Sequence, residues 1–163
     1  MTAATEPQLA ATHPTPAGPF TFISGAAGVC AAGFTDDLAL VSALRGPRHR
    51  RAEVQLTTRA GPASDAVMAW TDGEADAPLA VDVDLEGTEF QQAVWAALRT
   101  IAPGHPLTYT ALAAAAGRPA AVRAAGRGCA TNRASLFVPC HRVVPMTGGA
   151  GSFLWGRSVK EAL

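Results

Sequence analysis

Three features that would assign the chain to other classes of protein are missing from its sequence. It has only three cysteines, which are too few and too scattered for a disulfide framework: Cys30, Cys129 and Cys140. No C-x-x-C or H-x-x-x-H pair occurs, so the paired spacing of a zinc site is absent. We therefore expect no metal and no cofactor.

Long apolar runs are also missing. No stretch of 18 or more apolar residues occurs, and the uncharged segment 20–34 is interrupted by two polar residues and three glycines, so no membrane span is expected. Residues 1–19 lack a basic region followed by an apolar one, which argues against a secretion signal. The sequence thus predicts a cytoplasmic protein without membrane contact.

The formal net charge is zero, but the two halves of the chain differ in sign. Residues 1–87 contain 5 Arg and 11 Asp or Glu, a net charge of −6, whereas residues 88–163 contain 7 Arg, one Lys and two Glu, a net charge of +6. A basic unit favours a phosphate-backbone partner, although arginine-rich surfaces are common in proteins without one. The 163 residues, 48% of them hydrophobic, suffice for one compact domain or two small ones.

Three units are predicted along the chain. Residues 1–19 have four prolines and many small residues, which predicts a flexible tail. Residues 20–87 are predicted to form a small antiparallel sheet domain, with short apolar stretches at Phe20–Ile23, Gly28–Phe34 and Val54–Leu56 and a short helix at Ala66–Trp70. Residues 88–163 form the third unit.

Two polar groups in the sheet domain have alternative interpretations. Val81, Val83 and Leu85 alternate with Asp82 and Asp84, which predicts a half-buried strand. The two aspartates would share a face, either as a solvated edge or as part of a metal site. The basic cluster is interpreted as a solvated loop, with DNA contact as the alternative: Arg45, Arg48, Arg50 and Arg51.

The third unit is predicted to be mainly helical. Thr88 and Gln91 form a capping box at the start of a helix that ends before Pro103-Gly104. Its apolar stripe has helical spacing and predicts a core face: Phe90, Val94, Trp95, Leu98 and Ile101. A second helix is expected over 110–116 with Thr108 near its N-cap, and a third over 120–130 with Pro119 in its first turn. The turn at 117–119 joins them in a helix-turn-helix pattern.

The third helix consists mostly of alanine and glycine. Arg123 and Arg127 project from it at i, i+4 spacing. Small side chains permit close approach, either to a protein neighbour or to the minor groove of DNA. The composition does not choose between the two.

Cys140 follows a short apolar run, Leu136–Val138, that is expected to be buried. Pro139 should end the run and place the thiol on a bend beside the core. A free thiol has a pKa of roughly 8.5, so a nucleophilic cysteine needs a base or a positive neighbour. His141 is adjacent but would need a turn or a bridging water to reach the sulfur. A buried structural cysteine is the alternative.

The motif P-C-H-R-V-V at 139–144 resembles the active-site motif of the O6-alkylguanine-DNA alkyltransferases. The resemblance covers 88–163 and is strongest to the C-terminal half of Ada-type adaptive-response proteins. Its further motifs occur in the family's order: F-x-x-x-V-W at 90–95, L-T-Y-x-x-L at 107–112, A-V-R-A at 121–124, N-R at 132–133 and G-S-F-L-W-G at 151–156, followed by Lys160.

The resemblance implies an α/β (α+β) fold with a small N-terminal antiparallel sheet domain and a C-terminal winged-helix or helix-turn-helix-like domain. It implies DNA repair by stoichiometric alkyl transfer from O6-alkylguanine in double-stranded DNA to Cys140, with O4-alkylthymine as a further candidate substrate. His141 would relay the thiol proton through a water, and Asn132 would hold the turn at the active site. The protein is expected to act as a monomer.

The resemblance also implies how DNA would be held. Arg123 would fill the place of the flipped guanine, and Tyr109 would displace its 3′ phosphate. Further DNA contacts are expected from Thr108, Ala121, Ala124 and Arg127. The substrate pocket is expected to include Tyr109, Pro139, Val143 and Trp155, and Cys129 is expected to pack beside it.

One feature of the family pattern is missing. The family usually has a glutamate several residues beyond the position of Lys160, which orients the histidine. Glu161 is too near to take this role, so the expectation is a shortened chain or an incomplete relay, with a less depressed thiol pKa and slower transfer. Three alternative functions stay open: a module that recognises alkylated bases without transfer, a cysteine hydrolase, and an Ada-type regulator fragment.

Overall fold

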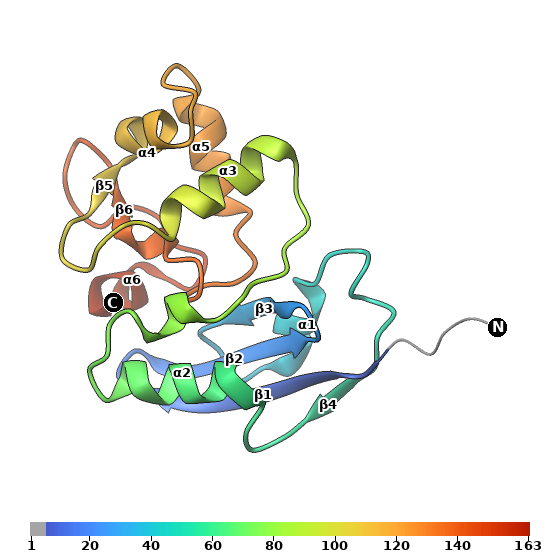
Figure 1. The fold of residues 1–163 in the computed structure, drawn as a ribbon. Coiled ribbons are helices and arrows are strands. Elements are labelled where there is room, and N and C mark those ends of the chain that lie inside the picture. Colours follow the sequence, from blue (N-terminus) through green and yellow to red (C-terminus); the bar gives the residue numbers. More distant parts are fainter. Residues whose placement is uncertain (1–5) are drawn as a thin grey trace.

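Short, largely buried segments in the first third of the chain form a four-stranded sheet. The computed structural model describes residues 6–163 (Figure 1). The strands are β1 (Gln8–Thr15), β2 (Gly18–Gly25), β3 (Gly28–Gly33) and β4 (Val54–Leu56), in the order β3-β2-β1-β4. The first three strands pair antiparallel, whereas β4 pairs parallel to β1. The predicted fold class is confirmed, with a mixed sheet in place of a wholly antiparallel one.

The prediction of a flexible tail over 1–19 is wrong from residue 8 onward, because β1 lies inside the sheet. Its first residues pair with both β2 and β4, whereas Pro14 lies beyond the end of β4 and is paired with β2 alone. A proline lacks the N–H for a ladder hydrogen bond, so the unpaired side is where the sheet tolerates it. Residues 1–5 of the predicted tail lie outside the described residues.

The two faces of the sheet are covered differently. Ala10, Ile23 and Ala31 form one buried cluster with Val41 of α1 (Leu38–Ala43). Their sequence neighbours Ala11, Phe22 and Ala32 point the other way, as successive strand residues do, and join the main core. The helix predicted at 66–70 is confirmed as α2 (Gly61–Thr71), which packs on this second face.

The segment between the sheet and the C-terminal helices is extended but not a strand. It contains the short 3-10 helix η1 (Ala77–Ala80). The strand predicted at 81–85 is reduced to a single bridge between Val83 and Val29, so that prediction is wrong. The N–H of Asp84 still donates to the carbonyl of Val29, and the N–H of Val29 donates to the carbonyl of Asp82. The alternation therefore reflects burial beside β3 without a continuous ladder.

The C-terminal half is mainly helical, as predicted (Figure 1). Its elements are α3 (Glu89–Leu98), β5 (Leu107–Thr108), α4 (Tyr109–Ala115), α5 (Val122–Ala130), η2 (Cys140–Arg142), β6 (Val143–Val144) and α6 (Arg157–Ala162). The capping box of Thr88 and Gln91 and the N-cap at Thr108 are confirmed. The third helix begins two residues later than predicted, so Pro119 lies in the preceding turn and not in the first helical turn.

A single apolar core joins the two halves. It contains residues of β1, β2, α2, α3, α4 and α5. Phe137, in the segment before Cys140, lies with its ring centroid 5.9 Å from that of Phe20 and 5.9 Å from that of Phe22. The chain that carries the candidate nucleophile is therefore packed directly on the sheet.

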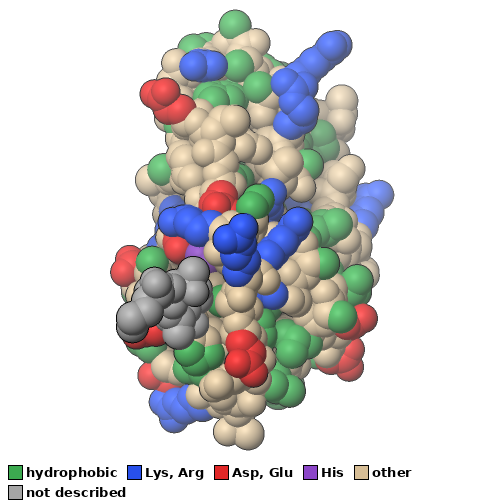
Figure 2. All heavy atoms as spheres, turned by 90° about the vertical axis from the view of Figure 1, so that its right-hand side faces the viewer, with side chains coloured by type: hydrophobic (Ala, Val, Ile, Leu, Met, Phe, Trp, Pro, Cys, Tyr) green, Lys and Arg blue, Asp and Glu red, His purple; other side chains and the backbone are tan. Residues whose placement is uncertain are grey.

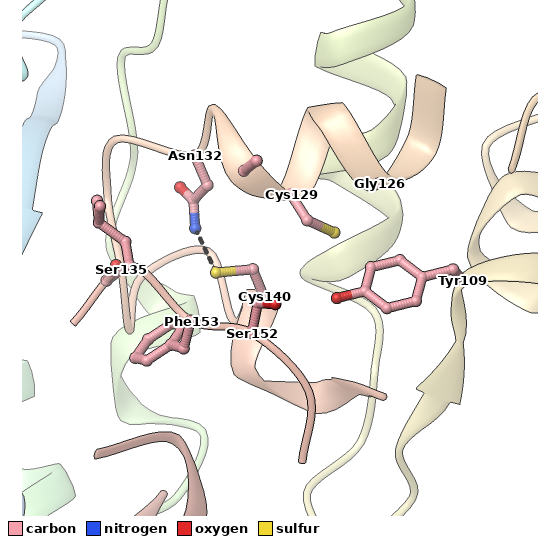
Figure 3. Close-up of a pocket in the computed structure, with 10 residues that line it drawn as sticks. Tyr109, Gly126, Cys129, Asn132, Ser135, Cys140, Ser152 and Phe153 are labelled. Carbon is pink, nitrogen blue, oxygen red and sulfur yellow. Dashed lines mark hydrogen bonds between the residues drawn. The ribbon is translucent and has the colours of Figure 1, made fainter. Parts of the chain in front are cut away.

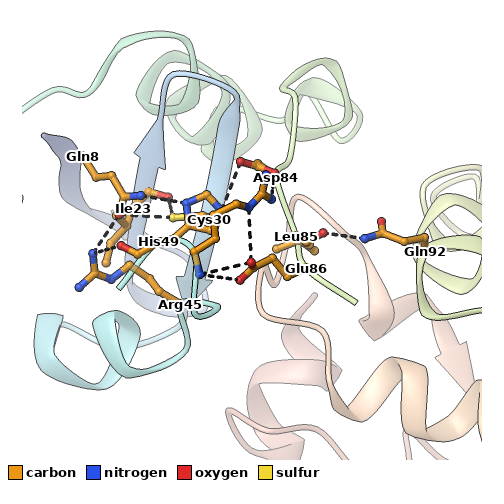
Figure 4. Close-up of polar contacts among 10 residues, drawn as sticks. Gln8, Ile23, Cys30, Arg45, His49, Asp84, Leu85, Glu86 and Gln92 are labelled. Carbon is orange, nitrogen blue, oxygen red and sulfur yellow. Dashed lines mark hydrogen bonds and ion pairs between the residues drawn. The ribbon is translucent and has the colours of Figure 1, made fainter. Parts of the chain in front are cut away.

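A polar cluster at the junction complements this core (Figure 4). Arg48 pairs with Asp84 at 2.7 Å and with Glu86 at 3.4 Å, and His49 Nε2 lies 3.2 Å from Asp84. Arg45 is buried and donates to Gln8 and to backbone carbonyls, so the prediction of a solvated basic loop is wrong for this residue. Figure 2 shows a group of Lys and Arg side chains across the middle of one face, with acidic side chains beside it.

No helix within residues 6–163 has the length and apolar character needed to cross a membrane.

Candidate functional site

Cys140 begins η2 at the end of the buried run predicted from the sequence. Leu136, Phe137 and Val138 are nearly fully buried, and Cys140 itself is only 9% exposed. Leu136 has a φ of 74°, a conformation that costs a non-glycine residue about 1 kcal/mol or more. The buried side chain of Leu136 and the bond from Val138 N to Ala134 O hold this turn. The thiol is therefore presented by a rigid segment.

Asn132 connects this segment to the end of α5. Its Nδ2 donates to the carbonyl of Val138 at 2.8 Å and lies 3.1 Å from Sγ of Cys140, while its Oδ1 accepts from the N–H of Ala134 at 3.0 Å. The side chain is buried, so these bonds are protected from water. The geometry agrees with the predicted turn-holding role and adds a direct contact with the sulfur.

Burial raises the pKa of the Cys140 thiol above its usual value, and two neighbours oppose this shift. The hydrogen bond from Asn132 and the positive charge of Lys160 both lower the pKa. Desolvation is the largest effect, so the resting side chain is a neutral thiol at neutral pH.

Lys160 was not assigned a role from the sequence. It is the only lysine in the chain, lies 5% exposed on α6, and donates from Nζ to the carbonyl of Ser152 at 3.2 Å. Burial lowers the pKa of its ammonium, and the nearby Cys140 and Cys129 raise it. The signal in the sequence was a lone lysine directly after the 151–156 motif.

His141 adjoins Cys140 in sequence, but among the described residues the polar contact with the sulfur comes from Asn132. The imidazole is largely buried, and its Nδ1 has no hydrogen-bond partner within residues 6–163. Burial, with Arg142 and Lys160, lowers the pKa of His141 to about 3, so the ring is neutral at pH 7. Glu161 is exposed and pairs with Arg157 at 2.9 Å, which agrees with its exclusion from the relay.

A pocket of about 450 Å³ opens beside the thiol (Figure 3). Helix α5 contributes one wall, the segment 152–154 another, and Tyr109 points its hydroxyl toward the cavity. The lining residues are Tyr109, Gly126, Cys129, Ala130, Asn132, Ser135, Cys140, Ser152, Phe153 and Leu154. Burial raises the pKa of Tyr109, so its hydroxyl keeps its proton and can donate a hydrogen bond.

Of the four residues predicted to shape the pocket, Tyr109 alone lines it. Pro139 and Val143 are absent from its wall, and Val143 is fully buried in β6. Trp155 stands behind the wall, with Nε1 donating to Ser135 Oγ at 2.9 Å. The small residues of α5 were predicted to serve close approach, but Gly126, Cys129 and Ala130 also leave room for the cavity.

The residues predicted to contact DNA lie on or near the helix-turn-helix. Arg123 and Arg127 are exposed on the same side of α5, and Tyr109 begins α4. Thr108, Ala121 and Ala124 are partly exposed. On its opposite side α5 packs against α3, where Gly128 faces Val94. The packing interpretation of the small-residue helix therefore holds on the α3 side, and the opposite side, with Arg123 and Arg127, is exposed.

Comparison with known proteins identifies a matching family and several relatives. Residues 89–163 match the family described as 6-O-methylguanine DNA methyltransferase, DNA binding domain. The methylated-DNA–protein-cysteine methyltransferase of Salmonella typhimurium is 37% identical over 116 residues, covering 71% of this chain and 68% of that protein. The bifunctional transcriptional activator/DNA repair enzyme Ada of Escherichia coli is 47% identical over 90 residues, covering 55% of this chain and 25% of that protein.

Solved structures agree over nearly the whole chain. The O6-methylguanine methyltransferase of Mycobacterium tuberculosis has a TM-score of 0.73 at 28% identity, covering 96% of this chain and 89% of that chain. The same organism's OGT in complex with DNA has a TM-score of 0.68 at 27% identity, covering 89% and 84%.

The fold and the site together define a helix-turn-helix protein with a buried thiol at the base of a pocket. The chain belongs to the 6-O-methylguanine DNA methyltransferase family. It spans 25%, 38% and 42% of the first three curated relatives that it matches.

Proposed function

We propose that this protein repairs DNA by moving an alkyl group from O6-alkylguanine in a duplex onto Cys140, once per molecule. The observation that carries the proposal is the position of Cys140 Sγ, which lies in a pocket bordered by the helix-turn-helix and contacted by a buried amide. We further propose that the protein acts as a monomer. O4-alkylthymine is a further candidate substrate.

The chemistry is an in-line displacement at the alkyl carbon. The Cys140 sulfur attacks that carbon, the S–C bond forms, and the C–O6 bond breaks with its electron pair remaining on guanine. The thiol proton passes through a water to the neutral His141, and guanine takes up a proton in exchange. Asn132 and Lys160 stabilise the charge that develops on the sulfur. A thioether is not readily cleaved, so each molecule reacts once.

A base that stays stacked within the duplex cannot enter the pocket. We propose that α5 enters the minor groove with Arg123 filling the place of the extruded guanine and Arg127 near the phosphates, because both are exposed on one face of the helix. Extrusion costs roughly a few kcal/mol, part of which Arg123 would recover. Thr108, Tyr109, Ala121 and Ala124 would complete the DNA contact.

Two further proposals concern organisation and location. We propose that 8–87, which includes β1, and 88–163 act as a supporting sheet domain and a DNA-binding, alkyl-transferring domain. The three cysteines are free in the structure, and a nucleophilic thiol must stay reduced. This requirement favours the cytoplasm.

The test is mass spectrometry after incubation with a duplex that contains O6-methylguanine. The expected result is one added methyl on the Cys140 peptide at one equivalent per protein, lost in Cys140→Ser and retained in Cys129→Ser and Cys30→Ser. Binding of the alkylated duplex without a methylated peptide would overturn the transfer and leave lesion recognition as the function. Repeated turnover would instead indicate a hydrolase.

A further inference from the structure

The wall of the pocket formed by residues 152–154 has the N-terminal sheet behind it. Phe153 lines the pocket, and its ring centroid lies 6.5 Å from that of Phe34, directly after β3. Trp155 follows two residues later and reaches the last residue of the same strand, Gly33. One residue that lines the pocket and one that stands behind its wall are therefore supported by the end of a strand more than a hundred positions earlier in the chain.

Gly33 is required for this contact because of space and not because of its backbone conformation. Its φ is outside the left-handed region, so an alanine would be unstrained in the backbone. A Cβ at this position would nevertheless fall within 3.0 Å of three indole carbons of Trp155, namely Cζ2, Cη2 and Cε2. Real atoms do not approach so closely, so the ring would have to move.

The indole ring has little freedom to move without changing the pocket. Its Nε1 donates to Ser135 Oγ at 2.9 Å, and Ser135 lines the cavity. Its backbone continues from Phe153 and Leu154, which also line the cavity. The indole thus contacts Gly33 through its six-membered ring and Ser135 through Nε1, and its backbone follows directly on the 152–154 wall. Figure 3 shows Ser135 and Phe153 together at one side of Cys140, with Tyr109 at the other.

We propose that Gly33 is a positioning residue for alkyl transfer: by admitting the Trp155 indole against the end of β3, it sets how far the 152–154 wall stands from Cys140 and hence how large an alkyl group the pocket accepts. This inference rests on the proposed function, because it assigns the cavity to the alkylated base. It gives the N-terminal sheet a direct part in substrate selection.

We expect a side chain at position 33 to displace the indole, and with it the attached 152–154 segment, toward the cavity. The space beside the sulfur then narrows. A methyl group needs little of that space, whereas a benzyl group needs much more. In Gly33→Ala the rate of benzyl transfer is expected to fall by about tenfold more than the rate of methyl transfer, since a single methylene in an apolar pocket changes rates by roughly tenfold or more.

The experiment measures single-turnover rates with duplexes that contain either O6-methylguanine or O6-benzylguanine. The final amount of alkylated protein gives the fraction that is folded and active. The rate constant of that fraction measures how readily the pocket accepts each alkyl group. The ratio of methyl to benzyl rates is then independent of any loss of stability. Gly25→Ala is the matched control, because its Cβ would make only ordinary contacts of 3.6 Å with Gln8 in the same sheet.

A second substitution, at Trp155, distinguishes a positioning role of Gly33 from a general loss of structure. Trp155→Phe shortens the ring that meets position 33, so Gly33→Ala combined with Trp155→Phe should give the same methyl-to-benzyl ratio as Trp155→Phe alone. A ratio in Gly33→Ala equal to wild type, or a double variant that is worse than either single one, would overturn the proposal.

A readout without alkylated DNA keeps the two proposals distinguishable. Cys140 is labelled with iodoacetamide and with a bulkier maleimide, and its peptide is quantified by mass spectrometry. Gly33→Ala should slow the bulkier reagent selectively by about tenfold. If the wild-type protein transferred no alkyl group, the proposed function would fail while this labelling ratio would still report whether Gly33 sets the size of the pocket.

Discussion

The side-chain amide of Asn132 holds the sulfur of Cys140 and the backbone that carries it at the same time. Its Nδ2 lies 3.1 Å from Sγ and 2.8 Å from the carbonyl of Val138. Burial raises the thiol pKa, and this amide is the largest of the effects that lower it. The same side chain therefore controls both the position and the acidity of the candidate nucleophile.

Replacing Asn132 by Ala should raise the pKa of the Cys140 thiol, because the hydrogen bond that lowers this pKa is lost. The pH dependence of Cys140 labelling by iodoacetamide measures this shift. Thr131→Ala is the control, since its hydroxyl bonds to α5 and not to the sulfur. An unchanged pH profile in Asn132→Ala would contradict the assigned role.

Replacing Lys160 by Met should also raise the thiol pKa, because its positive charge lowers that pKa in the folded protein. Arg157→Met removes the same charge from the exposed face of α6 and should have little effect, since solvent screens it. Equal shifts in the two variants would show that net charge and not the buried position matters.

His141 should make the fold less stable in acid. Its pKa is lowered to about 3 in the folded protein from 6.5, so only the unfolded chain takes up its proton as the pH falls between these values. Its contribution is complete above about pH 6.5 and is lost toward pH 3. Between pH 7.5 and pH 5, urea unfolding should show a loss of about 1 to 2 kcal/mol that is absent in His141→Gln. Equal losses of stability in the wild-type protein and in His141→Gln would show that another group, for example His13, titrates in this pH range.

Arg123→Ala should slow transfer from duplex DNA by about 10 to 100-fold, because the extruded base would no longer be replaced in the stack. Transfer from free O6-benzylguanine, which needs no extrusion, should be unchanged. Arg127→Ala is the control on the same face of α5 and should weaken duplex binding generally, reducing the salt dependence by about one phosphate. A comparable loss with the free base would refute the proposed role of Arg123.

Two glycines of α5 should respond to alanine in opposite directions. A Cβ at position 128 would lie 2.9 Å from Val94 Cγ1, so Gly128→Ala should force α5 from α3 and destabilise the protein by about 1 to 3 kcal/mol. A Cβ at position 126 would lie 3.9 Å from Tyr109, and Gly126→Ala should stabilise the helix by about 0.5 to 1 kcal/mol. Denaturant unfolding compares the two, and changes of the same sign would disprove the assigned packing.

Local features were predicted well from the sequence. The capping box at Thr88, the N-cap at Thr108 and the buried run before Cys140 all depend on residues within a few positions of one another. Such interactions leave a readable pattern because helix spacing and strand alternation repeat along the chain. The error at 81–85 arose where contact with a distant segment decided the structure, whereas the error at β1 came from its proline-rich composition, since this strand forms a tight hairpin with β2.

What the sequence determined by itself was the family, the helix-turn-helix and the candidate nucleophile Cys140, since ordered motifs and short-range spacing suffice for these. The tertiary structure decided which side chains surround the sulfur: Asn132 contacts it, Lys160 is buried near it, and Phe153 closes the cavity in front of Phe34. These residues meet only because one core packs the two halves together, and the packing of surfaces distant in sequence has no periodic signature along the chain.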